Sequence, residues 1–196
     1  MAKYQARKLA GPWKSGYVLD LHTISSIVIG HDEFGHPQFD TTYSEVGGLL
    51  YRLKSRSDRS ALPELVETAA SFIRSWGIEF TAIVPVPPTK VYRTFQPVLA
   101  LGGELANTFK VPMLRSAIRK VKQIPELKNV YDPEERKRLL TGAFEVNHEA
   151  IKKQKILLVD DLYRSGATMN AITEVLQAAG ASEVYAFAFT QTRTKK

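Results

Sequence analysis

Two adjacent carboxylates, Asp160 and Asp161, follow a run of four apolar residues at 156–159, and a Ser-Gly-Ala-Thr string comes soon afterwards at 165–168. The apolar run is typical of a strand buried in a parallel sheet. Ligands of such sheets bind beyond the carboxyl ends of the strands, where we expect the carboxylates to lie. This spacing therefore predicts a binding site at one edge of a sheet.

The two halves of this motif suit two parts of one ligand. Residues 164–168 open a predicted helix, whose free N–H groups and positive dipole end favour a phosphate. Gly166 allows the backbone to approach closely, while Ser165 and Thr168 add hydroxyl donors. The two carboxylates can accept hydrogen bonds from vicinal ribose hydroxyls. A ribose 5-phosphate fits both halves.

A plainer interpretation stays open for each part. Asp160 and Asp161 could cap a helix, and Ser165-Gly166 could be an ordinary turn. The complete string is much rarer than either part, and it favours the binding site. The chain has neither a Walker A loop nor a Gly-x-Gly-x-x-Gly dinucleotide fingerprint.

The elements that must position this motif alternate between strands and helices. Apolar runs predict strands near 80–86, 155–159 and 184–189, with helices near 96–109 and 166–179 between them. This alternation predicts an α/β fold with a mainly parallel, twisted sheet flanked by helices.

Two further helices are expected earlier in the chain, and a long polar segment later. A helix at 46–53 has Ser44 as its candidate cap, and a helix at 62–76 ends at Gly77. Residues 115–140 are polar and poorly periodic apart from a short predicted helix at 133–140. A connection of this length in a compact domain is usually functional or mobile.

The N-terminal part differs in character. Residues 1–15 look like a tail, and three short strands are expected to form a β-meander, at 17–22, 24–29 and 38–43. We therefore divide the chain into an N-terminal tail and β-rich hood at 1–45 and an α/β domain at 46–196.

Composition limits the remaining choices. The 196 residues include no cysteine, which excludes disulfides and thiolate metal sites. No apolar stretch approaches membrane-spanning length, so we expect no membrane partner and a cytoplasmic protein. The net charge of +7 is spread along the chain without aromatic interleaving, so nucleic acid is a weakly supported partner.

Residues 156–168 resemble the phosphoribosyl-pyrophosphate motif of type I phosphoribosyltransferases. Other strings are similar to the ComF-like (competence-protein, amidophosphoribosyltransferase-like) branch, namely LLYRLK at 49–54, IVPVP at 83–87, ERKR at 135–138 and GAF at 142–144. The resemblance thus runs from about residue 46 to residue 193. It implies a type I phosphoribosyltransferase fold, a small hood that selects the acceptor, and often a homodimer.

The same resemblance implies an activity. A Mg²⁺-dependent glycosyltransferase of this kind binds 5-phosphoribosyl-1-pyrophosphate (PRPP), and Mg²⁺ is held through PRPP rather than by a direct protein site. The phosphoribosyl group would pass to an unidentified nitrogen acceptor with release of pyrophosphate. Phe34, Phe39 and Tyr43 could stack on an acceptor base, although a structural role is also open for each.

The resemblance also assigns site residues. Asp160 and Asp161 are the implied catalytic residues. The implied PRPP-binding residues are Asp160, Asp161, Leu162, Tyr163, Arg164, Ser165, Gly166, Ala167 and Thr168. The candidates for the pyrophosphate are Lys90, Arg93, Arg136 and Arg138, for which surface cations are the alternative.

Three features depart from the ComF-like pattern. The usual N-terminal cysteine zinc ribbon is absent, the basic loop after Pro87 is short, and Arg164 replaces a small hydroxyl residue. The short loop leaves a second function open. In that alternative the protein binds PRPP or a nucleotide without catalysis, as a regulatory or DNA-uptake accessory protein.

Overall fold

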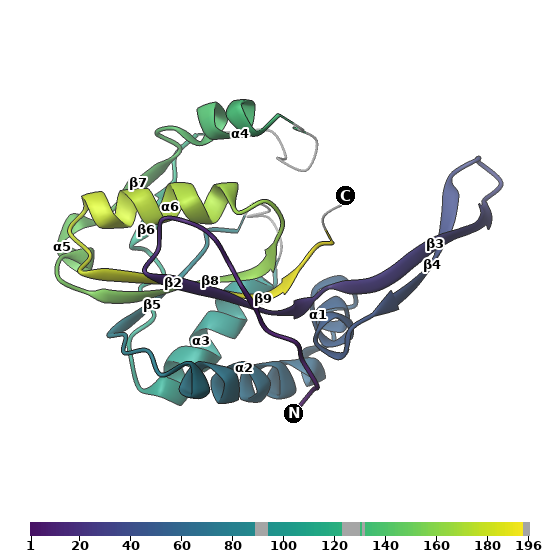
Figure 1. Cartoon of the computed structure of the whole chain (residues 1–196), viewed down its shortest axis with the longest axis horizontal. Coiled ribbons are helices and arrows are strands. Elements are labelled where there is room, and N and C mark those ends of the chain that lie inside the picture. The colour runs from purple at the N-terminus through teal and green to yellow at the C-terminus, as the bar shows by residue number, and fades with distance from the viewer. Residues whose placement is uncertain (89–93, 123–129, 131, 194–196) are drawn as a thin grey trace.

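A five-stranded sheet forms the centre of the molecule. The computed structural model describes residues 1–88, 94–122, 130 and 132–193. In this sheet the strand order is β1-β2-β9-β8-β5, and every pair is parallel except β1–β2 (Figure 1). The strands are β1 (Arg7–Lys8), β2 (Ser15–Leu21), β5 (Ala82–Pro85), β8 (Lys155–Tyr163) and β9 (Glu183–Gln191). The predicted α/β class with a mainly parallel sheet is confirmed.

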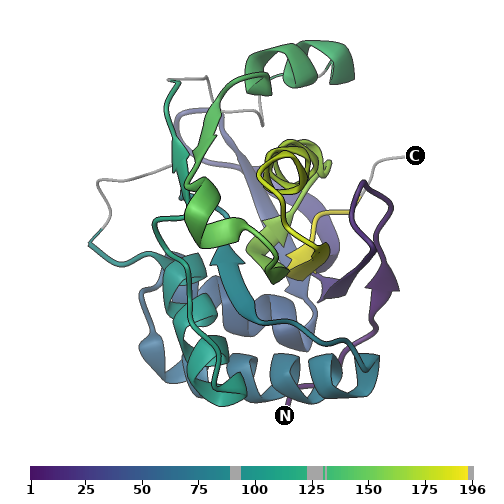
Figure 2. The same cartoon turned by 90° about the vertical axis from the view of Figure 1, so that its left-hand side faces the viewer.

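Helices cover both faces of this sheet. α6 lies on one face, and α2 and α3 lie on the other (Figure 2). The helices are α1 (Glu45–Ser55), α2 (Leu62–Trp76), α3 (Pro97–Phe109), α4 (Pro133–Leu140), α5 (His148–Ile151) and α6 (Ala167–Ala178), with a single 3₁₀ turn at Arg59–Ala61. None of the helices in the described part of the chain is both long enough and apolar enough to cross a bilayer.

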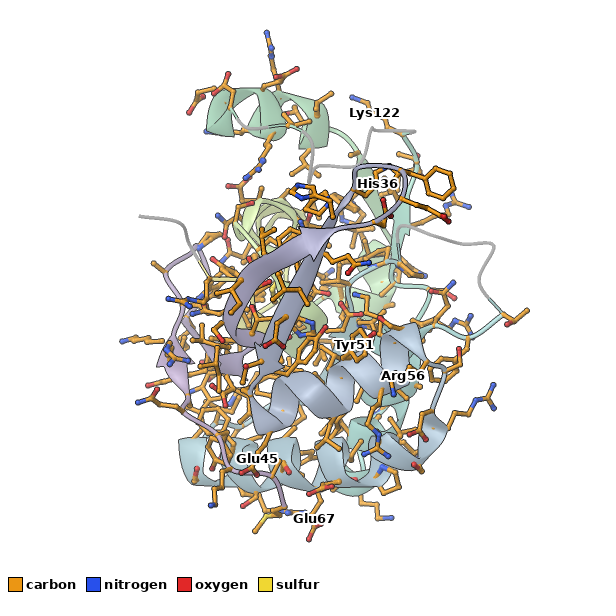
Figure 3. The ribbon with its side chains drawn as sticks, turned by 90° about the vertical axis from the view of Figure 1, so that its right-hand side faces the viewer. His36, Glu45, Tyr51, Arg56, Glu67 and Lys122 are labelled. Carbon is orange, nitrogen blue, oxygen red and sulfur yellow. The ribbon has the colours of Figure 1, made fainter. Side chains whose placement is uncertain are left out.

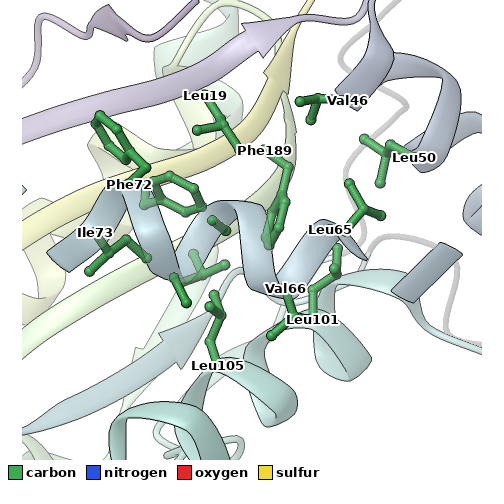
Figure 4. Close-up of a cluster of buried hydrophobic side chains, with 14 of the residues drawn as sticks. Leu19, Val46, Leu50, Leu65, Val66, Phe72, Ile73, Leu101, Leu105 and Phe189 are labelled. Atoms are coloured by element: carbon green, nitrogen blue, oxygen red, sulfur yellow. The ribbon is translucent and has the colours of Figure 1, made fainter. Parts of the chain in front are cut away.

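β8 contributes side chains to two separate hydrophobic cores, because successive residues of a strand point to opposite faces of the sheet. Leu157 and Val159 join the core beneath α1, α2 and α3, whereas Ile156 and Leu158 join the core beneath α6. All four are fully buried. The first core also holds large side chains from β2, β9 and three helices, among them Leu19, Leu50, Phe72, Leu101 and Phe189 (Figure 4).

The predicted helices are present close to their predicted bounds. Ser44 caps α1, since its hydroxyl accepts a hydrogen bond from the Gly47 N–H at 2.9 Å. α2 ends at Gly77, which adopts the left-handed conformation with φ 69°. α3, α4 and α6 match the helices predicted from periodicity to within one residue at most ends.

β8 is longer than predicted. The apolar run ends at Val159, but β8 continues to Tyr163 because β9 also continues and pairs with it, Leu162 opposite Thr190 and Tyr163 opposite Gln191. Asp160 and Asp161 therefore lie within the last four residues of β8 rather than beyond the end of the strand.

The N-terminal prediction needs two corrections. Residues 1–15 are not a tail, because β1 pairs with β2, and Leu9 and Trp13 are buried. The meander is confirmed in its second half, since β3 pairs with β4, but its first strand is wrong: β2 pairs in parallel with β9 in the central sheet. The apolar pattern of β2 indicated a strand but carried no information about its partner, which lies about 170 residues later.

The other two N-terminal strands form a separate hairpin. β3 (Thr23–His31) pairs only with β4 (Pro37–Tyr43) among the described strands. This β3–β4 hairpin extends away from the body of the molecule (Figure 1). A second small sheet, β6 (Ile118–Lys120) with β7 (Phe144–Val146), was not predicted, because three-residue strands are too short to show periodicity.

α1 lies very close to the end of β2. A Cβ atom at Gly47 would come within 2.0 Å of the carbonyl oxygen of His22, a backbone atom that cannot rotate away. The Ser44 hydroxyl also donates to the Leu21 carbonyl. Only glycine at position 47 permits this approach, which fixes α1 against the sheet.

Substitution of neighbouring glycines on α1 should therefore have opposite effects. Gly47→Ala should lower the free energy of unfolding by roughly 1–3 kcal/mol, the usual range for overpacking. Gly48→Ala is the matched control, because its Cβ would meet only Tyr43 at an ordinary 3.8 Å. Gly48→Ala should raise stability by about 0.5–1 kcal/mol through helix propensity. Urea denaturation measures both; equal effects would contradict this view of α1.

Candidate functional site

The carboxylate doublet lies at the carboxyl end of β8, between β5 and β9 in the sheet. Alternation along the strand places Asp161 on the same face as Leu157 and Val159, toward α1. Asp160 shares the opposite face with Ile156 and Leu158, toward α6. The two carboxylates therefore face different groups of the protein, although they are adjacent in sequence.

Asp161 is paired with a cation from a distant part of the chain. The Lys54 ammonium on α1 lies 2.8 Å from the Asp161 carboxylate, and their side chains are only 31% and 12% exposed. A partly buried ion pair of this kind is stronger than a salt bridge on the surface, because less water surrounds the two charges. Lys54 was not predicted as a site residue; the string at 49–54 was noted only for its resemblance to a family helix.

Asp160 is held differently. Its carboxylate accepts a hydrogen bond from the Asp161 N–H at 2.8 Å. The pKa of Asp160 is raised to about 7, mainly by burial and next by the neighbouring Asp161 charge, while Lys54 and the backbone donors act in the opposite direction. Near neutral pH, Asp160 thus exchanges readily between a carboxylate and a neutral carboxyl.

His22 and Thr190 adjoin this pair of acids. The Thr190 hydroxyl lies 3.3 Å from the His22 Nδ1 and can also donate to the Asp161 carbonyl at 3.4 Å. Burial lowers the pKa of His22, and the Lys54 charge lowers it further. His22 is consequently a neutral ring near pH 7. Sequence alone gave no reason to connect it with a doublet about 140 residues away.

Aromatic rings continue from His22 toward the base of the hairpin. Tyr43 meets the His22 ring edge-on at 5.5 Å and stacks on Tyr51 at 4.8 Å. Tyr43 thus already has an aromatic partner on one face. The other two candidates for acceptor stacking, Phe34 and Phe39, lie on the hairpin and are 77% and 56% exposed.

The predicted phosphate loop connects β8 with α6. Gly166 caps α6 with φ 77°, a conformation that L side chains rarely adopt. A Cβ there would also come within 2.3 Å of the Tyr163 hydroxyl. The first-turn N–H groups of α6 have no acceptor within the helix, and Arg164 and Ser165 are exposed beside them. The loop can therefore accept an anion.

The four predicted pyrophosphate residues have different outcomes. Lys90 and Arg93 lie outside the described residues. Arg136 and Arg138 lie on α4, which packs against α6. The Arg136 guanidinium donates to the Val130 carbonyl, whereas Arg138 is exposed.

The donor set suits a cation held mainly by a phosphorylated ligand. Among the residues described, no group of three or more His, Asp or Glu side chains could enclose a metal ion. Mg²⁺ is usually bound through one or two carboxylates together with substrate phosphates and water. Asp160 and Asp161 lie on opposite faces of β8, so the phosphates of such a ligand would provide most of the contacts to Mg²⁺.

Comparisons with solved structures give low sequence identities. The APRTase from Giardia lamblia is 18% identical over 85% of this chain and 80% of that one, with a TM-score of 0.49. Adenine phosphoribosyltransferase from Thermoanaerobacter pseudethanolicus is 16% identical over 86% and 95%, with a TM-score of 0.47. UMP synthase from Leishmania donovani is 18% identical over 83% of this chain, with a TM-score of 0.45, and the match spans only 27% of that protein.

Sequence families give a firmer result. A comparison with curated protein sequences finds no match. A family model described as the phosphoribosyl transferase domain matches residues 99–196, half of the chain, and this range contains the doublet, the loop and α6. The chain therefore belongs to the phosphoribosyl transferase domain family.

Proposed function

We propose that this protein binds PRPP and transfers its phosphoribosyl group to a nitrogen acceptor, releasing pyrophosphate. The observation that carries the proposal is that Asp160 and the amino end of α6 share one edge and one face of the sheet. Membership in the phosphoribosyl transferase domain family supports a transferase. We further propose the ComF-like branch on the strings described above, and a cytoplasmic protein.

The 5-phosphate would bind at the loop before α6. The amides of Gly166, Ala167 and Thr168 open the helix, and the hydroxyls of Ser165 and Thr168 stand beside them. Amides at a helix start bind a phosphate without a costly change of conformation. The exposed Arg164 can add a charged contact. Leu162 and Tyr163 complete the segment and keep it attached to the sheet.

The ribose would bind between this loop and the doublet. An ionised Asp160 can accept a hydrogen bond from a ribose hydroxyl, and Asp161 can accept another from the α1 side. The Lys54 ammonium keeps the Asp161 side chain in place. We therefore propose Lys54 as a positioning residue that acts through Asp161.

The chemistry at C1 requires mainly electrostatics and positioning. The bond from C1 to the pyrophosphate oxygen breaks as the acceptor nitrogen bonds to C1, and the ring gains positive charge on the way. Carboxylates held beneath the ring favour that charge, in a site partly shielded from water. When bound with PRPP, Mg²⁺ supplies neutralisation of the leaving pyrophosphate.

Four cationic side chains are proposed to bind the pyrophosphate. Lys90 and Arg93 follow the end of β5, a strand that ends beside the doublet. Arg136 and Arg138 lie on α4 above α6 (Figure 1). The exposed Arg138 has the freedom to turn toward an anion, while Arg136 must first leave the Val130 carbonyl.

The short loop after Pro87 favours a second candidate. Residues 88–96 carry only Lys90 and Arg93 as cations. A protein with the intact ribose phosphate site but weak pyrophosphate contacts would bind PRPP or a nucleotide without turnover, in a regulatory or DNA-uptake accessory role.

Neutralising Asp160 and Asp161 tests whether the two carboxylates are needed for release of pyrophosphate. With PRPP, Mg²⁺ and a panel of bases or ammonia, the protein should release pyrophosphate, measured by a coupled colour assay. Asp160→Asn/Asp161→Asn should lower the rate at least about a hundredfold, because two groups facing the developing charge are lost.

Glu145→Gln is the control for loss of a negative charge, because Glu145 is exposed and, among the described residues, pairs only with the exposed Arg119. It should leave the rate unchanged. Tight PRPP binding by calorimetry, with no release for any acceptor, would replace catalysis with the regulatory candidate.

Donor affinity should depend on pH through Asp160. Below a pH of about 7 the Asp160 carboxyl gains a proton and loses an acceptor for the ribose hydroxyl, so affinity should fall as pH falls. Lys54→Met removes a charge that lowers the pKa of Asp160, so the fall should begin at a higher pH. Lys54→Arg should retain the wild-type profile.

Titration calorimetry with PRPP and Mg²⁺ from pH 5.5 to 8.5 measures these profiles. The loss at the acidic end should be roughly tenfold to a hundredfold, as expected for one hydrogen bond to a charged group. Asp160→Asn provides the baseline, because its remaining pH dependence comes from the phosphates of PRPP. Identical profiles for Lys54→Met and the wild type would remove Lys54 from the proposed site.

A further inference from the structure

His22 lies at the ligand-binding edge of the central sheet. It directly follows β2, whose parallel pairing with β9 brings its carboxyl end to the same edge as the ends of β9 and β8. The His22 backbone N–H donates to the Gln191 carbonyl at 2.8 Å, which attaches the residue to β9. Because ligands of parallel α/β sheets bind at this edge, His22 borders the region of the proposed ligand.

The other three histidines of the chain lie elsewhere. His31 ends β3, His36 lies at the tip of the hairpin (Figure 3), and His148 begins α5. The His36 ring also lies 3.3 Å from the Asp32 carboxylate beside it. His22 is therefore the imidazole that the fold brings to the carboxylate doublet.

A short chain of hydrogen bonds determines which ring nitrogen of His22 carries the proton. The Thr190 hydroxyl lies 3.3 Å from the His22 Nδ1 and 3.4 Å from the Asp161 carbonyl oxygen. A carbonyl oxygen can only accept, so the hydroxyl donates its single proton to Asp161 and accepts a hydrogen bond from the Nδ1–H. The Nε2 atom of the neutral ring then keeps its lone pair.

This lone pair is available to a ligand. Within the described part of the chain, nothing donates a hydrogen bond to the His22 Nε2, and the side chain is only partly buried. The Tyr43 ring meets the imidazole edge-on at 5.5 Å and so limits its rotation. The nearby Arg193 guanidinium donates instead to the Ile24 carbonyl. His22 thus presents a basic atom in a fixed orientation.

The charges around His22 suit a group that gains and loses a proton. Burial lowers the pKa of His22 most, and the charges of Lys54 and Arg164 lower it further, while Asp161 acts in the opposite direction. Tyr43, from the hairpin, is a neutral phenol whose own pKa is raised mainly by burial. The imidazole is therefore neutral near pH 7, and the Asp161 charge offsets part of the charge that a proton would add.

We propose that the His22 Nε2 accepts the proton that the acceptor nitrogen loses during phosphoribosyl transfer. This role rests on the proposed function and completes its proton balance. The nitrogen lone pair forms the bond to C1, and the electron pair of the C1–oxygen bond leaves with pyrophosphate. The nitrogen, now positively charged, passes its N–H proton to Nε2 and leaves an imidazolium. The acceptor is accordingly a nitrogen that carries a hydrogen, as in ammonia or a ring N–H.

A weak base is sufficient for this step, because a nitrogen that has just bonded to C1 is strongly acidic. The two carboxylates have other partners: Asp161 is in an ion pair with Lys54 at 2.8 Å, and Asp160 faces the start of α6 on the opposite side of the strand. Thr190 acts through His22 as a positioning residue, because its hydroxyl fixes the ring tautomer.

Single-turnover measurements of pyrophosphate release test this role. His22→Asn keeps an N–H where Nδ1 contacts Thr190 but has no basic atom. Its rate should fall roughly a hundredfold to ten-thousandfold, the usual contribution of a general base. The dissociation constant for PRPP should stay within about twofold of the wild type, because the lost interaction belongs to the transfer step. His148→Asn, at an exposed histidine on α5, is the control and should change neither value.

Chemical rescue separates a lost base from a damaged fold. His22→Ala leaves space for free imidazole, which should raise the rate of that variant at least roughly tenfold by acting as the missing base. The same imidazole should have no effect on His148→Asn. Thr190→Ser keeps the hydroxyl and should retain the wild-type rate, whereas Thr190→Val should lower it.

The tautomer can be measured without any turnover. In ¹⁵N NMR spectra, the resonances that His22→Asn removes should be those of a neutral ring protonated at Nδ1. A ring protonated at Nε2 would overturn the role of His22. An active wild type whose rate His22→Asn leaves unchanged would also overturn it, while the proposed transfer would stand. A wild type that binds PRPP but releases no pyrophosphate with any acceptor would overturn both.

Discussion

The parallel pairing of β8 with β9 is the constraint on which the rest of the molecule depends. Both strands are buried on both faces, and their ladder runs from Lys155 opposite Glu183 to Tyr163 opposite Gln191. Because backbone groups at this depth must be paired, the two strands have to extend together. Their joint end delivers the acids to the rim and starts the turn into α6.

The electrostatics of the site follow from alternation along that ladder. One acid faces α1 and forms an ion pair with Lys54, while the other faces the start of α6, where burial raises the pKa of Asp160. Two chemically identical neighbours thereby have different electrostatic surroundings. An unequal pair suits a ligand that is a sugar on one side and a phosphate on the other.

The N-terminal residues have two uses in the fold. β2 completes the central sheet beside β9, and the following hairpin leaves the body (Figure 1). Gly47 allows α1 to pack closely against the end of β2. This packing holds Lys54 of α1 close to the base of the hairpin. The proposed donor site and the base of the hairpin therefore share a common support.

The sequence by itself determined the α/β class, the principal helices with caps such as Ser44 and Gly77, and the doublet–loop motif, because each is encoded by neighbouring residues. It did not determine the partner of β2, the true length of β8 or the short β6–β7 pair, since strand pairing depends on residues far apart in the chain. Only the tertiary structure brought Lys54, His22 and Thr190 to the doublet. The physical reason is that packing of α1 and β9 against β8, rather than any local spacing, decides which charges share a low-dielectric site.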